Sequence, residues 1–572
     1  LTASEMVLGG ISIDTTSGNG QIQFDGDVTL DGAVTITRGS GGIDFIGSVD
    51  SLDNEYSSLA IVSNADSGNS GGNVRFRQAV GTTSVRRLGS LAVDTSGELT
   101  IDSGAAINVT GPFTQTSAAG TGSVELGANI STNNAELSFA SPVVLTQSVA
   151  LSSGVGDGDV VFNGTIDAST DFTEALTLTS GTGDIQLTRA VGSNTPLGLL
   201  VINAASNVTL GALDTTADTF TVAALEQRVS GAEAFTLNGL LTAAAGGVSI
   251  DSKSVILNAG IITETGFDFN TSDDKGLVNI RAGSDGVQLA AGHSIQTTAL
   301  LAGAQSSEIK IVSAGSVTLL GDLVTTGASS GTGLGGMGGA VTITTTDQNA
   351  SITPANVNTS GGASTAPTGA GGDAGSLTLT TEGSILLAGG TILAAGGAGN
   401  TLGSGARLAF KDPVTLLGDS IVDTGSGSGE ISFEGTVQGK HELTVKGGQG
   451  GVLFEDVVGG SATSPNRLKR LTLTSDAIVG VANTHTTAGQ SYTAGMVILI
   501  GDSYTAGSEQ IESTGQTYLL QSVEMTAPEV VFDGLVDSYF DDETTPVSSL
   551  FSALTVDGNT RFTQAVGSGY AL

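Results

Sequence analysis

Short runs in which apolar and polar residues alternate, each ended by glycine, recur along the whole chain. The clearest begins at residue 18 and reads GNGQIQFDGDVTL; Ile22 and Phe24 share one face, and Val28 and Leu30 share a face after the next glycine. Alternation with a period of two predicts a half-buried strand, and glycine predicts the turn that ends it. Related runs are GGIDFIGSV from residue 41, GNVRFRQAV from 72, GDVVFNGTI from 158, GEISFEGTV from 429, GVLFEDVV from 451, EVVFDGLV from 529 and TRFTQAV from 560.

The spacing of these runs predicts the architecture. The interval from Phe24 to Phe45 equals the interval from Phe433 to Phe454, whereas Phe76 follows Phe45 at a longer interval. A unit of about 20 residues that accepts insertions of about ten is typical of a solenoid in which insertions form loops. We therefore predict an all-β fold, a right-handed parallel β-helix of about 20 to 25 residues per coil. The predicted core includes Ile22, Phe24, Val28, Phe45, Phe162, Phe433 and Phe454.

Composition fits a narrow solenoid interior. Hydrophobic residues make up 39% of the chain, but aromatic residues only 4%, Trp is absent and there are 86 Gly. We predict one continuous solenoid with regular coils over residues 1–210 and 406–572 and less regular, glycine-rich coils over 211–405. Two low-complexity segments, Gly327–Gly339 and Thr359–Gly375, are predicted to be loops that project from the solenoid, because strand-like runs flank each of them.

Net charge and cysteine content exclude several classes of partner. The chain has 19 Lys plus Arg against 56 Asp plus Glu, a formal net charge of −37. Such a field repels nucleic acid and anionic membranes, and it attracts divalent cations or a cationic surface. The absence of Cys excludes disulfides and thiolate metal sites. No apolar run reaches the roughly 18 residues that a membrane-spanning helix needs, so we expect no membrane insertion.

Catalytic chemistry has little support in the sequence. A β-helix that cleaves polysaccharide needs carboxylates clustered with each other or with Arg, Lys or His on adjacent coils. The three histidines, at 293, 441 and 485, lie far apart, and the one compact trio is Lys440-His441-Glu442. That trio falls between Val437 and Leu443, where a solvated turn is the favoured interpretation. We expect no catalytic residue and no enzyme, and a polysaccharide-active enzyme stays as the third alternative.

Calcium is the other chemical candidate. Asp25 and Asp27, with Asp31, flank one predicted turn, and Asp541 and Asp542 lie together near the end of the chain. Calcium requires several oxygens that converge on one point. A solvated acidic rim is the favoured interpretation, because the glycine- and aspartate-rich nonapeptide of calcium-loaded β-rolls is not present as an array. We therefore expect no cofactor and keep calcium as the open alternative.

Two other surface features are noted. The basic clusters, Arg86-Arg87 and Arg467 with Lys469-Arg470, are predicted to lie on insert loops, where they are solvated or bridge to acidic residues. The units GQSY, ending at Tyr492, and GQTY, ending at Tyr518, form a second repeat. Triplets of the form Asn-x-Ser/Thr leave glycosylation open, and chance produces several in so polar a chain.

The repeat style resembles that of giant bacterial surface proteins. Units such as VVFNGTI from Val160, followed by ALTLTSGTG from Ala175, look like the β-strand repeats of filamentous-haemagglutinin-like adhesins, and the GQSY and GQTY units belong to the same vocabulary. The likeness covers nearly the whole chain and carries no catalytic motif. It implies a secreted, elongated β-helical protein at the cell surface that acts as an adhesin, sheath or fibre.

The chain ends suggest how copies are arranged. The sequence begins with the strand-like run LTASEMVL and stops at FTQAVGSGYAL, part way through a unit. We expect a processed chain or a segment of something longer. The last coil would meet the first coil of a following copy, whose Leu1–Ser4 would supply the strand that the last unit lacks. The predicted partner is the protein itself, as a head-to-tail homopolymer or as tandem copies. The alternative is an adhesin, a secreted passenger that binds surface glycans or another host or environmental ligand.

Overall fold

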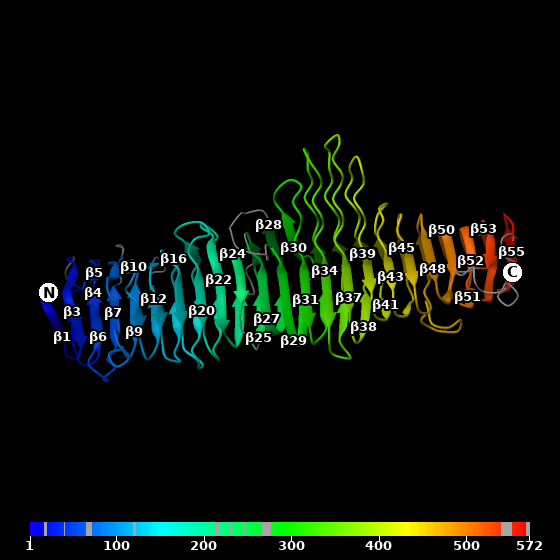
Figure 1. The fold of residues 1–572 in the computed structure, drawn as a ribbon. Coiled ribbons are helices and arrows are strands. Elements are labelled where there is room, and N and C mark those ends of the chain that lie inside the picture. The colour runs from blue at the N-terminus through cyan, green and yellow to red at the C-terminus, as the bar shows by residue number, and fades with distance from the viewer. Residues whose placement is uncertain are drawn as a thin grey trace, which may run out of the picture. The chain divides into compact units, whose positions relative to one another are not determined.

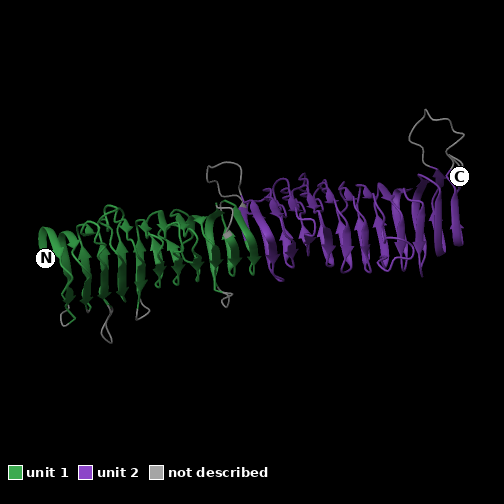
Figure 2. Cartoon of the chain, turned by 90° about the horizontal axis from the view of Figure 1, so that it is seen from below, with its two compact units in different colours: residues 1–261 green, residues 262–572 purple. Residues whose placement is uncertain are grey.

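In the computed structural model the chain is an all-β protein whose strands stack in parallel (Figure 1). The structure describes residues 1–16, 20–38, 40–63, 71–117, 122–212, 218–228, 232–244, 246–265, 276–538 and 552–567, and no helix occurs among them. The chain divides into two compact units, residues 1–261 and 262–572, which Figure 2 colours separately. The predicted parallel β-helix is confirmed.

The first unit is built from short strands. They are β1 (Thr2–Leu8), β2 (Ser12–Asp14), β3 (Ile22–Leu30), β4 (Val34–Arg38), β5 (Ile43–Phe45), β6 (Val49–Ser51), β7 (Leu59–Ser63), β8 (Val74–Phe76), β9 (Leu91–Thr95), β10 (Glu98–Ile101), β11 (Ile107–Asn108), β12 (Phe113–Thr116), β13 (Ser123–Leu126), β14 (Ile130–Ser131), β15 (Leu137–Phe139), β16 (Val143–Leu145), β17 (Val149–Ser152), β18 (Val160–Phe162), β19 (Ile166–Ala168), β20 (Leu176–Thr179), β21 (Ile185–Leu187), β22 (Leu197–Ala204), β23 (Asn207–Leu210), β24 (Thr219–Gln227), β25 (Ala232–Leu237), β26 (Leu240–Ala243) and β27 (Val248–Leu257).

From β28, the chain continues with further strands of the same kind. They are β28 (Ile261–Thr265), β29 (Val278–Leu289), β30 (Ser294–Ala299), β31 (Ile309–Ser313), β32 (Val317–Leu319), β33 (Asp322–Val324), β34 (Val341–Thr345), β35 (Ser351–Thr353), β36 (Val357–Asn358), β37 (Leu377–Thr380), β38 (Ser384–Leu387), β39 (Gly390–Leu393), β40 (Leu408–Phe410), β41 (Val414–Leu416), β42 (Ser420–Asp423), β43 (Ile431–Phe433), β44 (Val437–Gly439), β45 (Glu442–Lys446), β46 (Val452–Phe454), β47 (Arg470–Thr474), β48 (Ile478–Val481), β49 (Thr484–Thr486), β50 (Gln490–Leu499), β51 (Ser503–Ala506), β52 (Ile511–Leu519), β53 (Val523–Asp533), β54 (Val536–Ser538) and β55 (Leu554–Phe562).

Each coil of the first unit contributes to three parallel ladders. One ladder contains β2, β4, β7, β9, β12, β15, β18, β21, β23, β25 and β27. A second contains β1, β3, β5, β8, β10, β13, β16 and β19. In the third, β6 leads through single bridges at Val80 to β11, β14, β17, β20, β22 and β24. Each side chain therefore meets its counterpart one coil away.

The second unit repeats this three-ladder plan. The first ladder contains β29, β31, β34, β37, β40, β43, β46, β48, β50, β52 and β54. The second contains β29, β32, β35, β38, β41 and β44, and it continues through Val458 to β49, β51, β53 and β55. The third contains β30, β33, β36, β39, β42, β45, β47, β50, β52, β53 and β55. Long strands such as β50 take part in two ladders.

Coil length varies because insertions leave the stack. Leu237 pairs with Leu257 in the next coil, whereas Val341 pairs with Leu377, which lies much farther along the chain. The longer of these two coils contains the loop of residues 359–376, between β36 and β37. The stack therefore keeps its register while the loops absorb the difference.

Aromatic rings form stacks inside the coils. Phe433 packs between Phe410 and Phe454 with ring centroids 4.5 Å apart on both sides, and Phe45 packs between Phe24 and Phe76 at 4.8 and 5.0 Å. Of the seven predicted core residues, all but one are buried, and Ile22 is half-buried. Ile22 pairs with Ile43, but the register of β1 against β3 begins only at Asp25, so no paired residue covers its other side.

Candidate functional site

The acidic residues considered for calcium occupy separate structural positions. Asp25 is exposed, and the Asp27 carboxylate accepts hydrogen bonds from the Ser48 backbone N–H at 2.9 Å and from its hydroxyl at 3.0 Å. Asp27 thus stabilises a turn of the next coil. Asp541 and Asp542 lie outside the described residues. Within the described ranges, no group of three or more His, Asp or Glu is placed to hold a metal ion.

The trio Lys440-His441-Glu442 lies between β44 and β45, where Glu442 is the first residue of its strand. His441 Nδ1 is 3.4 Å from the Asp419 carboxylate, and Lys469 Nζ is 2.8 Å from that of Glu442. The backbone N–H of Glu442 and the His441 side chain lower the pKa of Asp419, and Glu442 raises the pKa of Lys469. These contacts join neighbouring coils at side chains that are partly or largely exposed, which agrees with the predicted solvated turn.

A shallow pocket of about 520 Å³ lies beside Arg470, the residue that follows Lys469. Arg470 Nη2 donates to Glu509 Oε1 at 2.8 Å and reaches past the intervening coil at Gly489. A Cβ on Gly489 would lie 2.9 Å from the Glu509 carboxylate, so this glycine leaves the space for the pair. Ser491 and Glu512 complete a polar rim, with further lining from Gln490 and Gln510. The lining residues are polar or charged apart from Gly489, so the pocket can offer hydrogen bonds.

The basic clusters fall in two settings. Arg86 lies in the loop between β8 and β9, and its Nε is 2.9 Å from the Asp53 carboxylate, which agrees with the predicted bridge to acidic residues. Arg467 and Lys469 lie in the segment between β46 and β47, and Lys469 pairs with Glu442, which agrees with the prediction, whereas Arg470 is not on an insert loop, so the prediction of its place is wrong. Arg470 begins β47, where it pairs in register with Glu442 of β45. The place of Arg470 is set by the ladder, which local composition does not reveal.

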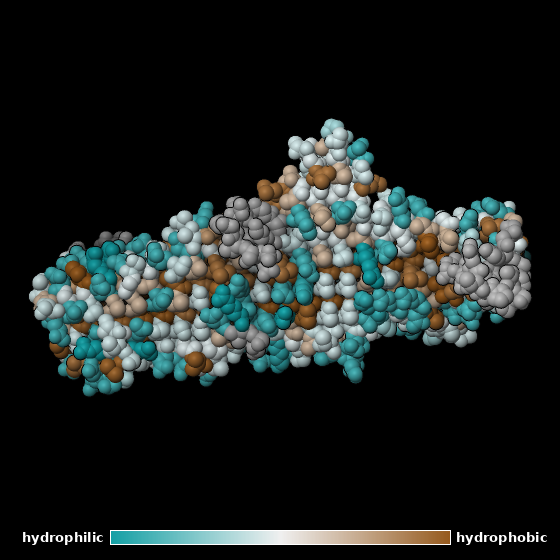
Figure 3. Space-filling view, in the orientation of Figure 1, coloured by the Kyte–Doolittle hydropathy of each residue, from teal (hydrophilic) through white to brown (hydrophobic). Residues whose placement is uncertain are grey.

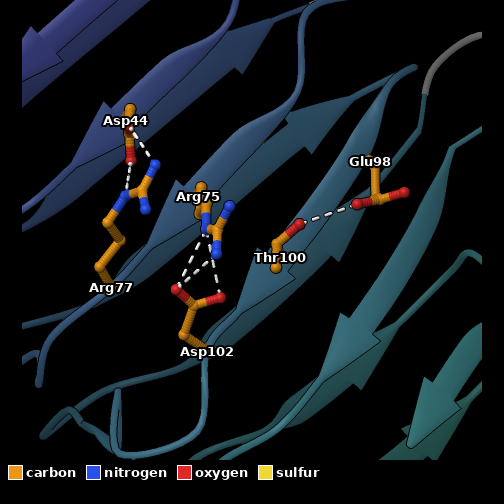
Figure 4. Close-up of polar contacts among 6 residues, drawn as sticks. All are labelled: Asp44, Arg75, Arg77, Glu98, Thr100 and Asp102. Carbon is orange, nitrogen blue, oxygen red and sulfur yellow. Dashed lines mark hydrogen bonds and ion pairs between the residues drawn. The ribbon is translucent and has the colours of Figure 1, made fainter. Parts of the chain in front are cut away.

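Two ion pairs join neighbouring coils near the start of the first unit (Figure 4). Asp44 of β5 accepts two hydrogen bonds at 2.9 Å from Arg77, which follows β8, and Arg75 of β8 pairs with Asp102 at 2.9 Å. The Asp44 side chain is almost fully buried, and the hydrogen-bonded Arg77 guanidinium holds the pKa of that carboxyl below its usual value. These charges therefore tie neighbouring coils together.

A buried polar cluster in the second unit was missed by the sequence pattern. Tyr492 and Tyr504 are both fully buried. The Tyr492 hydroxyl donates to Gln490 Oε1 at 2.7 Å, and Gln490 Nε2 donates to the Thr484 carbonyl at 3.0 Å. The Tyr504 hydroxyl donates to the Val481 carbonyl at 2.7 Å. Burial raises the pKa of both tyrosines, so the cluster is uncharged and stabilises the interior of these coils.

The GQSY and GQTY units are not equivalent in the structure, so their interpretation as one repeat is wrong. The first buries Gln490 and Tyr492, whereas the second buries Thr517 and leaves Tyr518 partly exposed. In register, Tyr492 pairs with Ser513, not with Tyr518. The signal that separates the two units is the residue that follows the second tyrosine. Leu519 is buried, so alternation places Thr517 on the buried face with it and Tyr518 on the other face.

His485, an isolated histidine in the sequence, is also buried. It belongs to β49, its Nδ1 has no hydrogen-bond partner in the described structure, and only 5% of its surface is exposed. Burial, together with the nearby Arg467 guanidinium, lowers its pKa. No spacing in the sequence connects these two residues, because the loop that carries Arg467 is brought over β49 by the coil stack.

Four successive loops in the second unit form what we name the glycine-rich projection (Figure 1). They are residues 300–308, 325–340, 359–376 and 394–407, and each connects one strand of the stack to the next. Both predicted low-complexity segments lie in it. Figure 3 shows mostly pale residues, of intermediate hydropathy, over this projection, with hydrophobic residues at several points.

Backbone hydrogen bonds join the loops of the projection into one network. Within each loop the two arms are joined, and each loop is joined to the next one. The series is Gly336 N to Ala328 O at 2.8 Å, Gly362 N to Gly336 O at 2.8 Å, Gly372 N to Gly362 O at 2.9 Å, Gly397 N to Gly372 O at 2.8 Å and Gly403 N to Gly397 O at 3.0 Å.

Glycine is required in this network because the backbones are in direct contact. An added Cβ would lie closer than 3.0 Å to a backbone oxygen of an adjacent loop, a distance that real Cβ atoms do not show. This holds at Gly336, Gly362, Gly372, Gly397 and Gly403. The low-complexity composition is therefore a packing requirement of a layered structure.

Comparisons with known proteins identify no relative of this chain. No protein-family model, no curated protein and no solved structure matches it. In the part of the chain that the structure describes, no helix is long and apolar enough to span a membrane.

Proposed function

We propose that this chain is a structural extracellular protein, one subunit or period of a self-assembling filament or sheath at the cell surface. Copies join end to end through β-helix coils, as separate chains or as tandem copies in one polypeptide. The observation that supports this function is the open strand edge on the outermost described coils. β1 pairs with β3 and β55 pairs with β53, and no described strand lies against their other sides.

The chemistry of these edges favours the addition of another coil. An open edge carries unpaired N–H and C=O groups, which a parallel strand of a further coil can satisfy. The apolar interior also ends there without full cover, since Leu1 is 69% exposed and Phe562 is 39% exposed. Phe562 stacks on Phe532 at 5.3 Å on one face, so an added coil would cover the other face.

The test is assembly of the purified chain, followed by electron microscopy and light scattering. The Thr563 N–H donates to the Phe532 carbonyl of β53. Because backbone N–H groups alternate between the two sides of a strand, the Thr560 N–H faces the open side. Thr560→Pro removes this donor, and Thr560→Val keeps it as the matched control. We expect the wild type and the valine variant to form filaments and the proline variant to stay short. A wild type that stays monomeric at high concentration would refute the proposal.

The adhesin is the second candidate, and the glycine-rich projection is the observation that favours it. Its loops extend away from the coils on a backbone network that holds them in place. Such a projection can present loop tips to surface glycans or to another ligand on a host or environmental surface. The test replaces residues 327–339 and 361–373 by short turns and measures binding on immobilised glycans. Equal binding by the shortened and native proteins would exclude this role.

A further inference from the structure

The glycine-rich projection differs from the rest of the chain in its charge. Its four loops contain only three charged side chains, those of Glu308, Asp373 and Arg407, and Glu308 and Arg407 are the last residues of their loops, directly before β31 and β40. The Asp373 carboxylate accepts a hydrogen bond from the Ser404 backbone N–H at 2.7 Å, within the projection. The chain as a whole has a net charge of −37. Two copies therefore repel each other in general, and the projection is a surface where they can meet with little like-charge repulsion.

The same loops expose large apolar side chains. Leu301 is 59% exposed, Leu334 65%, Met337 46% and Leu402 50%. None of these four residues is next to a charged residue in the sequence, and Figure 3 shows hydrophobic residues at several points of the projection. Several large apolar side chains exposed on a surface with few charges are typical of an interaction site.

The backbone network makes this surface rigid. Each loop is hydrogen-bonded to the next, and because glycine has no side chain the backbones of adjacent loops are in direct contact. Little conformational entropy is then lost when the surface is covered, which favours association. The loops follow one another at the coil spacing of about 4.8 Å, and a second projection has ridges at the same spacing.

The geometry points to a self-association surface, on which the projection of a second copy of this chain packs against the first. The contact is isologous, with the same loops on both sides, and it joins copies laterally. It therefore goes beyond the end-to-end joining proposed above. Matching ridge spacing and the small number of like charges both favour a second copy over an unrelated partner.

Sedimentation velocity over a range of concentrations tests this contact. The variant Leu301→Ser/Leu334→Ser/Leu402→Ser removes three exposed leucines of the projection. The matched control Leu320→Ser/Leu417→Ser/Leu520→Ser removes three leucines that are similarly exposed elsewhere in the second unit. We expect the first variant to weaken lateral association by about a thousandfold, because each of the three buried leucines contributes on the order of tenfold.

The control should change association less than about threefold, and added salt should strengthen association of the wild type by screening its net charge. Equal association of the projection variant and the wild type would overturn the inference, as would a wild type without lateral association. So would loss of glycan binding by the projection variant with association intact, which would assign the surface to an external ligand.

Cross-linking supplies a second, independent readout, since the chain contains no cysteine. Under oxidation, Leu334→Cys should form a disulfide-linked dimer, and Leu417→Cys should remain uncross-linked. The reverse result, or equal cross-linking of both, contradicts a projection-to-projection contact. Thr560→Pro should block filaments and retain this dimer, so failure of the end-to-end proposal is distinguishable from failure of this one.

Discussion

Replacement of Phe433 by Ala should lower the free energy of local unfolding of the coils around it by about 4 kcal/mol. The Phe433 ring is fully buried and stacks on Phe410 and Phe454 at 4.5 Å, with interplanar angles of 4° and 5°. A buried Phe→Ala substitution costs about 3 to 5 kcal/mol, and loss of two ring contacts favours the upper part of that range. In a solenoid this cost falls on the coils in contact.

Native-state hydrogen exchange measures this effect locally. A loss of about 4 kcal/mol accelerates exchange of the protected amides in β40, β43 and β46 about a thousandfold. Amides of β32, several coils away, should change little. Leu417→Ala is the matched control, because Leu417 is 53% exposed and its truncation should cost less than about 0.5 kcal/mol. Exchange in β43 within tenfold of the wild-type rate would show that the ring stack does not hold these coils together.

Three further substitutions test buried polar groups and the glycine network. Arg38 is 3% exposed, and its Nε and Nη2 have no described partner, so Arg38→Met should raise the free energy of unfolding by about 1 to 4 kcal/mol; a lower urea midpoint would contradict this. Burial and Arg467 lower the pKa of His485, so the unfolded chain binds the proton more readily and stability should fall as pH drops below about 6.5. His485→Gln should reduce that loss between pH 7.5 and 5.5, and an unchanged pH dependence of the thermal midpoint would argue against it. Gly397→Ala should destabilise the projection by about 1 to 3 kcal/mol, measured by hydrogen exchange, whereas Gly331→Ala, whose Cβ would meet only one atom, at 3.9 Å, should have little effect; equal effects would refute the packing argument.

Local pattern was sufficient to predict the fold and much of the core. Phe24, Phe45 and Phe433 are inside because alternation fixes which side chains share a face, and the recurring spacing of the runs brings the same face back once per coil. The alternation and the spacing of the runs can both be read from the order of residues along the chain, without knowledge of contacts between coils. The candidate surface was partly predictable in the same way, since composition alone marks Gly327–Gly339 and Thr359–Gly375 as loops.

Contacts between coils were decided only by the tertiary structure. The sequence contains Arg470, Gly489 and Glu509 but gives no reason to join them, and it gives Tyr492 and Tyr518 the same motif although only Tyr492 is fully buried. The physical reason is coil length. Some coils are short and others carry a long insertion, so no fixed sequence interval identifies the partner of a residue in the next coil. Stacking sets that register, and with it the ion pairs, the buried tyrosines and the glycine contacts of the projection.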